Sequence, residues 1–219
     1  MKSTYTIIAV SRNLPKLEKV FPDPEIIKVP LDLYDTFQIS LTLNKLCQEF
    51  DIYGLINNAY DLSPTTGFNT PEGAFELMPL SMMEKGLQSG ILAPMLFCQI
   101  IGKQMIDKRI AGSMVNISSM YGTVSPHPKL YEGKTNFNPI TYGVTKSALN
   151  ALTRYIAAFW GSHGIRCNSI APGSFPNTET ESVNAPQDHE FIQRLKDKTV
   201  FGRVGHPKEL LGLIELLLS

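Results

Sequence analysis

The pairing in this sequence with the most chemical potential is a tyrosine followed four residues later by a lysine, Tyr142 and Lys146. Both fall in a stretch with helical spacing, which puts their side chains on one face, a turn apart. A phenol has an ordinary pKa of about 10, and a nearby cation can lower it by roughly 1–3 units. The pair therefore suits proton transfer to or from a carbonyl or alcohol oxygen. Both residue types are common on helix surfaces, so this spacing alone is weak evidence.

Three more polar motifs follow apolar stretches that resemble buried strands. They are Asn57-Asn58-Ala59, Val115-Asn116-Ile117-Ser118-Ser119 and the run from Ile165 to Gly173. The carboxyl ends of parallel strands meet at one edge of an open α/β sheet, and ligands bind there. We therefore expect the hydroxyl of Ser119 to lie near Tyr142 and Lys146.

The elements that would position these groups alternate between strands and helices. Strands are expected at Thr6–Val10, Ile26–Val29, Tyr53–Ile56, Ser113–Ile117 and Ile165–Ile170, each buried on both faces. Helices are expected at Thr36–Phe50, Ser81–Lys108, Tyr142–Trp160 and Pro207–Ser219, with a kink or break near Pro94. In the third helix one face is apolar, formed by Val144, Ala148, Ala151, Leu152, Tyr155, Ile156 and Phe159. This alternation predicts an α/β fold with a doubly wound parallel sheet, covered by helices on both faces.

The order NNA, VNISS, YxxxK and IRxNSIAPG is similar to the short-chain dehydrogenase/reductase family, over nearly the whole chain. The resemblance implies a Rossmann-like three-layer fold and a catalytic site of Ser119, Tyr142 and Lys146. In that family the tyrosine is the acid–base, and the lysine lowers its pKa and binds the nicotinamide ribose. The serine holds the reacting oxygen. The cofactor channel is lined by residues matching Asn58, Ala59, Pro172 and Gly173.

The resemblance also indicates a cofactor. A neutral residue followed by an arginine, here Ser11 and Arg12, suits the 2′-phosphate of NADP(H), whereas the family's NAD users tend to carry an acid there. We therefore expect NADP(H), with NAD(H) the less favoured alternative. Asp32 matches the family's adenine-contacting aspartate. Two plainer readings stay open, that Arg12 only solvates a strand end and that Asp32 caps a turn.

The sequence departs from the family pattern in three places. Its first glycine is Gly54, so the opening strand and Gly-x-x-x-Gly-x-Gly turn, which approach the pyrophosphate, are missing. That strand would lie between the strands ending at Arg12 and Asn57. Gly90 stands where the family has a catalytic asparagine, and Gln88, Ser89 or water are the candidate replacements. The family's final strand is also absent after Ser219. We expect one incomplete domain over residues 1–219, truncated at both ends, that binds NADPH weakly.

One segment is longer than usual for the family. Ser119 and Tyr142 stand 23 residues apart, about ten more than is common, and the surplus lies in Pro126–Asn138, which would overhang the substrate. Within it, the side chains of residues 131–134 suit a polyhydroxylated ligand. Tyr60 replaces the glycine that usually follows NNA. Together these features resemble a subgroup associated with bacterial surface-sugar and flagellin-glycan pathways.

Composition excludes several functions. The 20 basic and 20 acidic residues cancel, which argues against a nucleic-acid partner. The three cysteines are widely spaced in apolar contexts, which indicates buried thiols in a reducing compartment and no metal site. No secretory signal and no stretch of about 18 apolar residues is evident, so we expect a cytoplasmic protein with no membrane partner. Surplus apolar residues on two helices predict a homodimer or homotetramer.

The leading hypothesis is an NADP(H)-dependent oxidoreductase that interconverts a carbonyl and an alcohol on a small molecule, with a sugar-like substrate as the narrower expectation. One alternative is a non-catalytic relative that binds or scaffolds. Another is an inactive fragment of an enzyme of this family. The Ser–Tyr–Lys set argues for the first, and the missing glycine turn argues against activity of the chain as it stands.

Overall fold

A computed structural model describes residues 5–134, 138–176 and 189–219 of the chain. The strands are β1 (Ile8–Ser11), β2 (Ile27–Pro30), β3 (Gly54–Asn57), β4 (Ser113–Ile117) and β5 (Arg166–Ile170). The α-helices are α1 (Leu14–Val20), α2 (Thr36–Glu49), α3 (Leu80–Leu87), α4 (Ala93–Asp107), α5 (Ile140–Trp160), α6 (His189–Asp197) and α7 (Leu211–Leu218). The short helical turns are η1 (Pro64–Thr66), η2 (Pro71–Gly73), η3 (Phe75–Leu77), η4 (Gln88–Leu92), η5 (Met120–Gly122), η6 (Pro128–Tyr131), η7 (Gly161–His163) and η8 (Pro207–Leu210).

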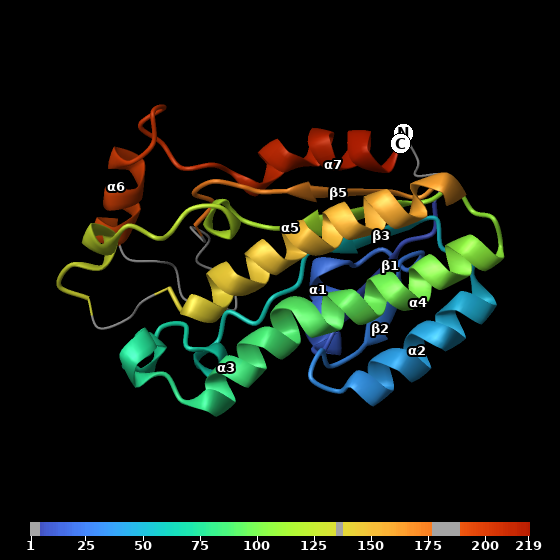
Figure 1. Ribbon diagram of the computed structural model, residues 1–219, viewed down its shortest axis with the longest axis horizontal. Helices are drawn as coiled ribbons and strands as arrows, with labels where there is room; N and C mark the ends of the chain where they lie inside the picture. The colour runs from blue at the N-terminus through green and yellow to red at the C-terminus, as the bar shows by residue number, and fades with distance from the viewer. Residues whose placement is uncertain (1–4, 135–137, 177–188) are drawn as a thin grey trace.

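The layers follow the α/β prediction. Helices α2, α4 and α5 lie side by side in front of the strands, and α1 lies behind them (Figure 1). Helix α7 packs along β4, where Ser113 Oγ donates a hydrogen bond of 2.6 Å to the carbonyl of Leu217. The Rossmann-like α/β architecture is confirmed.

The strands are parallel but form two separate ladders among the described residues. One ladder pairs β1 with β2, and the other has the order β3–β4–β5. The break falls between β1 and β3, where the sequence comparison with the family places the absent strand. A single hydrophobic cluster still joins the two ladders, because Ile8 and Val10 of β1 pack against the same core as Leu55 of β3.

All five predicted strands are present, with ends that differ by two residues or fewer. Strand β4 is buried on both faces as predicted. Strand β3 is not, because Ile56 exposes 43% of its surface on the face opposite Leu55. The prediction that every strand is buried on both sides is therefore wrong for β3 and also for β5, where Arg166 and Ser169 are exposed. Strands β1 and β2 are only partly buried.

The predicted long helix is one helical run, Leu80–Asp107, that changes its winding in the middle. A π-turn, η4, separates α3 from α4, and Pro94 follows it in the first turn of α4. Proline lacks an N–H and crowds the carbonyl four residues earlier, so the wider turn is the expected local answer. This run is long and apolar enough to cross a membrane, but just over half of its most apolar stretch is buried in the fold. It serves as a core helix here.

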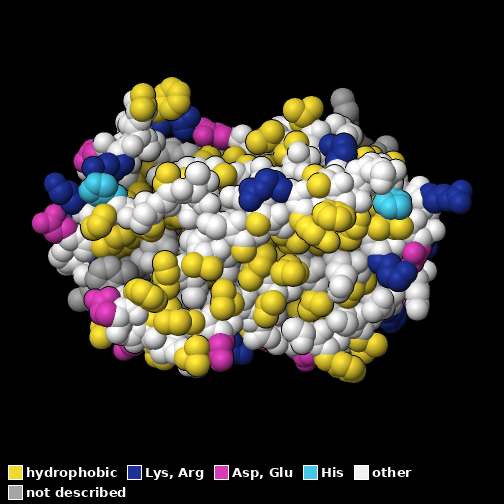
Figure 2. Space-filling view, viewed as in Figure 1, with side chains coloured by type: hydrophobic (Ala, Val, Ile, Leu, Met, Phe, Trp, Pro, Cys, Tyr) yellow, Lys and Arg dark blue, Asp and Glu magenta, His cyan; other side chains and the backbone are white. Residues whose placement is uncertain are grey.

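Helix α5 buries only part of its predicted apolar face, with Ile156 in the core and Leu152 packed against it. Its inward residues include Thr145, Leu149 and Ile156, whereas Tyr155 and Phe159 from the predicted apolar face expose 57% and 63% of their surfaces. Those two rings stack on each other, with centroids 4.3 Å apart. Hydrophobic side chains gather along the α4–α5 side of the molecule (Figure 2). An apolar face of a helix usually packs against another part of the chain or against a partner. Here Tyr155 and Phe159 are not covered by any other described part of the chain.

Candidate active site

The structure brings the predicted catalytic side chains together at the carboxyl end of β4. Ser119 follows β4 in extended backbone and caps η5, where its Oγ accepts a hydrogen bond of 3.2 Å from the amide of Tyr121. Tyr142 lies in the first turn of α5, with its phenol within hydrogen-bonding reach of the Ser119 hydroxyl. Lys146 Nζ lies 5.5 Å from the centre of the Tyr142 ring. The Ser119 hydroxyl and the Tyr142 phenol therefore lie together, and the Lys146 ammonium lies over the face of the Tyr142 ring.

A polar network ties α5 to the strand ends and fixes this geometry. Ser118 Oγ donates a hydrogen bond of 2.9 Å to the carbonyl of Lys146. Below it, the Asn116 amide donates to Thr153 Oγ1 and accepts from the Asn57 amide, both at 2.9 Å. Asn116 is fully buried, so each of these bonds satisfies a group that would otherwise be costly to bury. Asn57, Asn116 and Ser118 thus link the strand ends to each other and to helix α5, which carries Tyr142 and Lys146.

The buried ammonium of Lys146 donates a hydrogen bond of 2.6 Å to the carbonyl of Ile117. Burial disfavours the charged form and lowers the pKa of Lys146 from its ordinary 10.5 to about 8. A lysine in this state is available to a ligand hydroxyl, because only part of its donor capacity is used.

The predicted direction of the Tyr142 pKa is wrong for this structure. Burial of the phenol raises its pKa, and the hydrogen bond from Ser119 offsets this only in part. The expected lowering required the ammonium to lie beside the phenol oxygen. Lys146 instead lies over the ring and donates to Ile117, so its charge does not offset the burial.

The predicted cofactor residues surround the two ends of an elongated site. Near α2, a cavity of about 440 Å³ is lined by Arg12, Pro30, Leu31, Asp32, Asp35, Gln38 and Thr42. Asp32 accepts a hydrogen bond of 3.0 Å from the amide of Tyr34, so it does cap a turn, and it also faces the cavity. Near Ser119, Ala59 and Gly173 are exposed at neighbouring strand ends. The carbonyl of Pro172 accepts a hydrogen bond of 2.9 Å from Met120, which joins the β5 end to η5.

Arg12 forms an ion pair with Asp61, a residue that the sequence analysis did not identify. Its Nη1 lies 3.2 Å from Oδ2 of Asp61, and Tyr34 Oη donates to the same oxygen at 2.8 Å. Burial works against the ionised Asp61, but hydrogen bonds from Ser63 and Tyr34 and the charge of Arg12 bring its pKa below the ordinary value. This pair links the end of β1 to the loop after β3, across the break in the sheet. The sequence feature that could have indicated Asp61 is its place directly after the NNA motif and Tyr60.

An extended dinucleotide fits this site at its ends. The guanidinium of Arg12 and the cavity beside it suit a phosphorylated adenosine, and the partly free Lys146 ammonium suits ribose hydroxyls. Between them, the described residues include no glycine turn that could offer backbone N–H groups to a pyrophosphate. The described residues thus suit the two ends of a nicotinamide dinucleotide, but they include no glycine turn that would bind its pyrophosphate.

Comparison with known proteins decides the family. A family model described as enoyl-(acyl carrier protein) reductase, of the short-chain dehydrogenase C2 type, matches residues 5–219. The chain belongs to the short-chain dehydrogenase/reductase family. An L-rhamnose 1-dehydrogenase (NAD(P)(+)) from Sphingomonas sp. strain SKA58 is 30% identical over 149 residues, which cover 68% of this chain and 54% of that protein. The matched part thus spans about half the length of that relative.

Solved structures agree on the fold of this short-chain dehydrogenase/reductase. A short-chain dehydrogenase from Leptospira borgpetersenii with bound NAD+ superposes with a TM-score of 0.76, at 23% identity, over 99% of this chain and 76% of that one. A gluconate 5-dehydrogenase from Burkholderia cenocepacia, in complex with NADP and tartrate, gives 0.75 at 23% identity, over 98% and 78%. These likenesses show the α/β fold.

Where the family has its asparagine, this chain has a glycine packed against an aromatic ring. A Cβ added to Gly90 would lie 2.6 Å from Tyr60 and 2.7 Å from Thr145, so the Tyr60 ring occupies the space of a side chain there. The suggested replacements do not reach the site. Gln88 donates to the carbonyl of Tyr34, and Ser89 Oγ donates to the carbonyl of Lys85. Tyr60 fills the position instead, as its unusual place after NNA could have indicated.

The long segment before α5 is fastened to α6. Arg194 donates to the carbonyls of Leu130 and Glu132, and Lys134 Nζ lies 2.8 Å from Glu190. The predicted sugar-binding ammonium is therefore already paired. Part of the predicted insertion, residues 135–137, lies outside the described residues.

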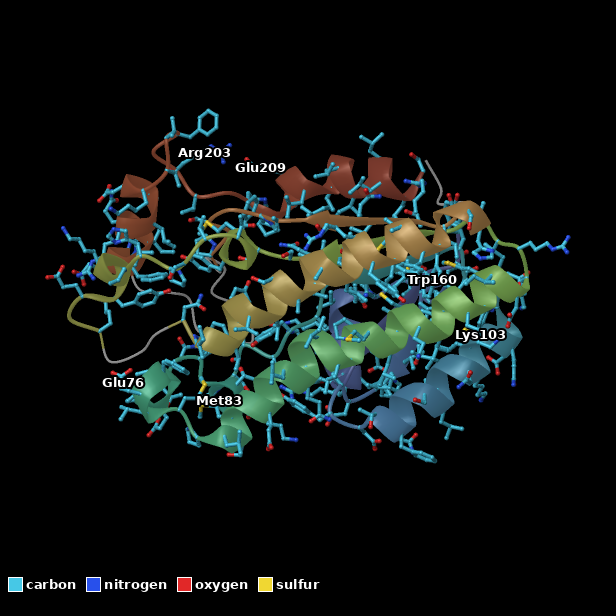
Figure 3. All side chains as sticks on the ribbon, viewed as in Figure 1. Glu76, Met83, Lys103, Trp160, Arg203 and Glu209 are labelled. Atoms are coloured by element: carbon cyan, nitrogen blue, oxygen red, sulfur yellow. The ribbon has the colours of Figure 1, made fainter. Side chains whose placement is uncertain are left out.

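A second cavity, of about 560 Å³, lies between this segment and the loop after β3. Glu76 (labelled in Figure 3) and Phe75 line it on one side. Tyr131 and Glu132 line it on the other, and Gly143, next to Tyr142, closes its inner end. The lining is mostly apolar, with side chains such as Phe75, Pro126 and Ile140, and it also includes the carboxylates of Glu76 and Glu132. Within the described residues, no three His, Cys, Asp or Glu side chains could share a metal ion.

Proposed function

We propose that this chain is the main part of an NADP(H)-dependent oxidoreductase that interconverts a carbonyl and an alcohol on a small, sugar-like molecule. The observation that carries the proposal is the convergence of Ser119, Tyr142 and Lys146 beside an open edge of the sheet. A hydroxyl and a phenol that face one point can bind one substrate oxygen and exchange a proton with it.

In the proposed reaction the nicotinamide cofactor supplies or accepts the hydride. In the reducing direction, the Ser119 hydroxyl donates a hydrogen bond to the carbonyl oxygen and orients it. The Tyr142 phenol then transfers its proton to that oxygen, so the product is the neutral alcohol. Burial keeps Tyr142 protonated in the chain without ligand, but the raised pKa also makes its phenol a weaker proton donor. The Lys146 ammonium lies over the Tyr142 ring, 5.5 Å from its centre, and its remaining donors would bind the ribose of the cofactor.

The preference for NADP(H) rests on Arg12, whose guanidinium would bind the 2′-phosphate at the mouth of the adenosine cavity. Asp32 would contact the adenine end. Asn58, Ala59, Pro172 and Gly173 would line the nicotinamide channel. Asp61 competes with the phosphate for Arg12, which weakens the preference but leaves the assignment in place. Named relatives bind NAD+ as well as NADP, so NAD(H) is the alternative.

A sugar or polyol is the substrate class that agrees best with the relatives. Those relatives are named as rhamnose and gluconate dehydrogenases. A role in bacterial surface-sugar or flagellin-glycan synthesis is the narrower proposal, and it rests on Tyr60 and the long segment before α5. We place the protein in the cytoplasm, because its three cysteines are free thiols, two of them buried.

A second candidate function is binding without catalysis. The Arg12–Asp61 ion pair favours this second candidate. The pair spans the break in the sheet, at the place where the family's glycine turn would approach the pyrophosphate. Charge-assisted contacts of that kind are worth roughly 1.5–3 kcal/mol each, so losing two or three weakens affinity by on the order of a hundredfold to ten-thousandfold or more.

The test compares the chain as given with the same chain preceded by a strand and GxxxGxG turn from a family member. NADPH binding is measured by titration calorimetry, and NADPH oxidation is followed at its absorbance band with a panel of aldoses, ketoses and simple ketones. We expect micromolar binding and sugar-dependent oxidation only in the extended chain. The proposal would be contradicted if the chain as given binds NADPH with micromolar affinity. It would also be contradicted if the extended chain binds NADPH but reduces no carbonyl compound.

A further inference from the structure

Two aromatic rings pack against Tyr142, the tyrosine of the acid–base pair. Tyr60 and Phe68 both meet the ring of Tyr142 edge-on, with centroids 5.1 Å and 5.5 Å away, and they meet each other at 6.0 Å. Edge-to-face contacts at these distances are favourable and fix the plane of a ring. Tyr142 is therefore held from two sides, by residues from the loop after β3.

Only one of the two clamping rings also meets the ammonium. Lys146 Nζ lies over the Tyr60 ring at 5.7 Å from its centre, and over the Tyr142 ring at 5.5 Å. A cation within about 6 Å of an aromatic face is attracted by the ring's negative face, and more strongly so when water is excluded. Among the described residues, Phe68 makes no such contact with an ammonium group.

The position of Tyr60 depends on small residues in the facing helix. Gly86 and Gly90 lie four residues apart and face Thr141 and Thr145 of α5, so the two helices approach closely. At Gly90 the bare backbone of η4 leaves room for the Tyr60 ring, which a Cβ would contact at 2.6 Å. The ring thus occupies a place shaped for it.

The hydroxyl of Tyr60 has no acid–base task in this arrangement. It is buried without a hydrogen-bond partner of ordinary geometry, although the hydroxyls of Thr141 and Thr145 lie near it. Burial raises the pKa of Tyr60 to about 12, so the phenol stays protonated at neutral pH. What Tyr60 offers Lys146 is its ring.

We propose that Tyr60 is a positioning residue for the acid–base pair, holding the Tyr142 ring edge-on and placing its own ring against the Lys146 ammonium in the space that Gly90 leaves. The inference rests on the proposed function only for the roles of Tyr142 and Lys146. The phenols of Tyr60 and Tyr142 are the titratable groups that face Lys146. Besides burial, the charge of Asp61 raises the pKa of Tyr60, and Tyr142 raises the pKa of both Tyr60 and Tyr121.

The test replaces Tyr60 by phenylalanine and then by 3,4,5-trifluorophenylalanine in the full chain. Fluorine withdraws charge from the ring face while the ring keeps nearly its size, so packing is preserved. The pKa of Lys146 is followed by NMR of labelled lysine side chains, with Lys146→Met assigning the signal. We expect Tyr60→Phe to leave the pKa unchanged and the fluorinated ring to lower it by about half a unit to one unit.

The matched control carries the same trifluorinated ring at Phe68, which clamps Tyr142 but does not lie against Lys146. That variant should leave the Lys146 pKa in place. An unchanged pKa in the Tyr60 series, or equal shifts in the two series, would overturn the inference. Because this measurement needs neither cofactor nor turnover, its failure leaves the proposed oxidoreductase activity to be judged separately.

Discussion

The chemistry of the site depends on how burial and charge compete at single residues. Tyr142 and Lys146 are both largely buried, and burial disfavours the charged form of each, raising one pKa and lowering the other. The motif's spacing predicted the two residues on one face, and that holds. The spacing could not predict the orientation of the ammonium, because this depends on the carbonyl of Ile117 and the ring of Tyr60.

Lys146 carries a pH-dependent cost to stability. Its pKa is about 8 in the folded chain, below the ordinary 10.5, so the cost is fully present below pH 8 and is relieved as pH rises toward 10.5. Lys146→Met should therefore raise the free energy of unfolding at pH 7, with a gain that shrinks by about 2 kcal/mol at pH 9.5. Urea denaturation of both proteins at the two pH values measures this. A gain that is constant, or larger at pH 9.5, would show that burial is not what depresses the pKa.

At the scale of elements, most of the secondary structure could be predicted from the sequence. The strand cores and the four long helical regions are where the apolar patterns place them. The short helices α1 and α6 were not predicted, because stretches of seven and nine residues carry little periodicity. How much of the apolar face of α5 is buried could not be predicted either, since Ile156 lies in the core while Tyr155 and Phe159 are exposed. A hydrophobic stripe does not distinguish the interior from a surface that awaits a partner.

The crossing of η4 and α5 should be sensitive to a single methyl group. Gly90→Ala would place a Cβ within 2.7 Å of Tyr60 and Thr145, and neither can withdraw easily, so we expect a loss of about 1–3 kcal/mol. The matched control is Gly212→Ala in α7, where nothing lies within 4 Å of the added atom. There alanine should stabilise the helix by about 0.5–1 kcal/mol. Thermal denaturation compares the two, and equal effects would refute the close approach at Gly90.

For the whole molecule, the informative feature is the divided sheet. The family pattern placed a gap between the strands that end near Arg12 and Asn57, and the ladders are separate there. The sequence could not predict how the gap is bridged. The Arg12–Asp61 pair and the shared core depend on side chains 49 residues apart, which local patterns do not connect.

The uncovered apolar side of α4 and α5 leads to a prediction about assembly. We expect the chain to form homodimers or homotetramers through this surface, where the exposed rings of Tyr155 and Phe159 stack on each other. Phe159→Asp should shift the sedimentation coefficient to that of a monomer. Phe37→Asp on α2 changes an equally exposed ring outside this surface and should leave the assembly intact. A monomeric parent chain at high concentration would contradict the prediction.

The most direct test of the proposed activity is Tyr142→Phe in the chain extended by the strand and glycine turn. Removing one oxygen takes away the proton that the substrate must receive, and leaves the cofactor ends untouched. Turnover of the best carbonyl substrate should fall by about 100- to 10,000-fold, as expected for loss of a general acid. NADPH affinity, measured by calorimetry, should stay within about threefold of the parent. Turnover that survives within tenfold would contradict the assignment of Tyr142 as the acid–base and, with it, the account of this site.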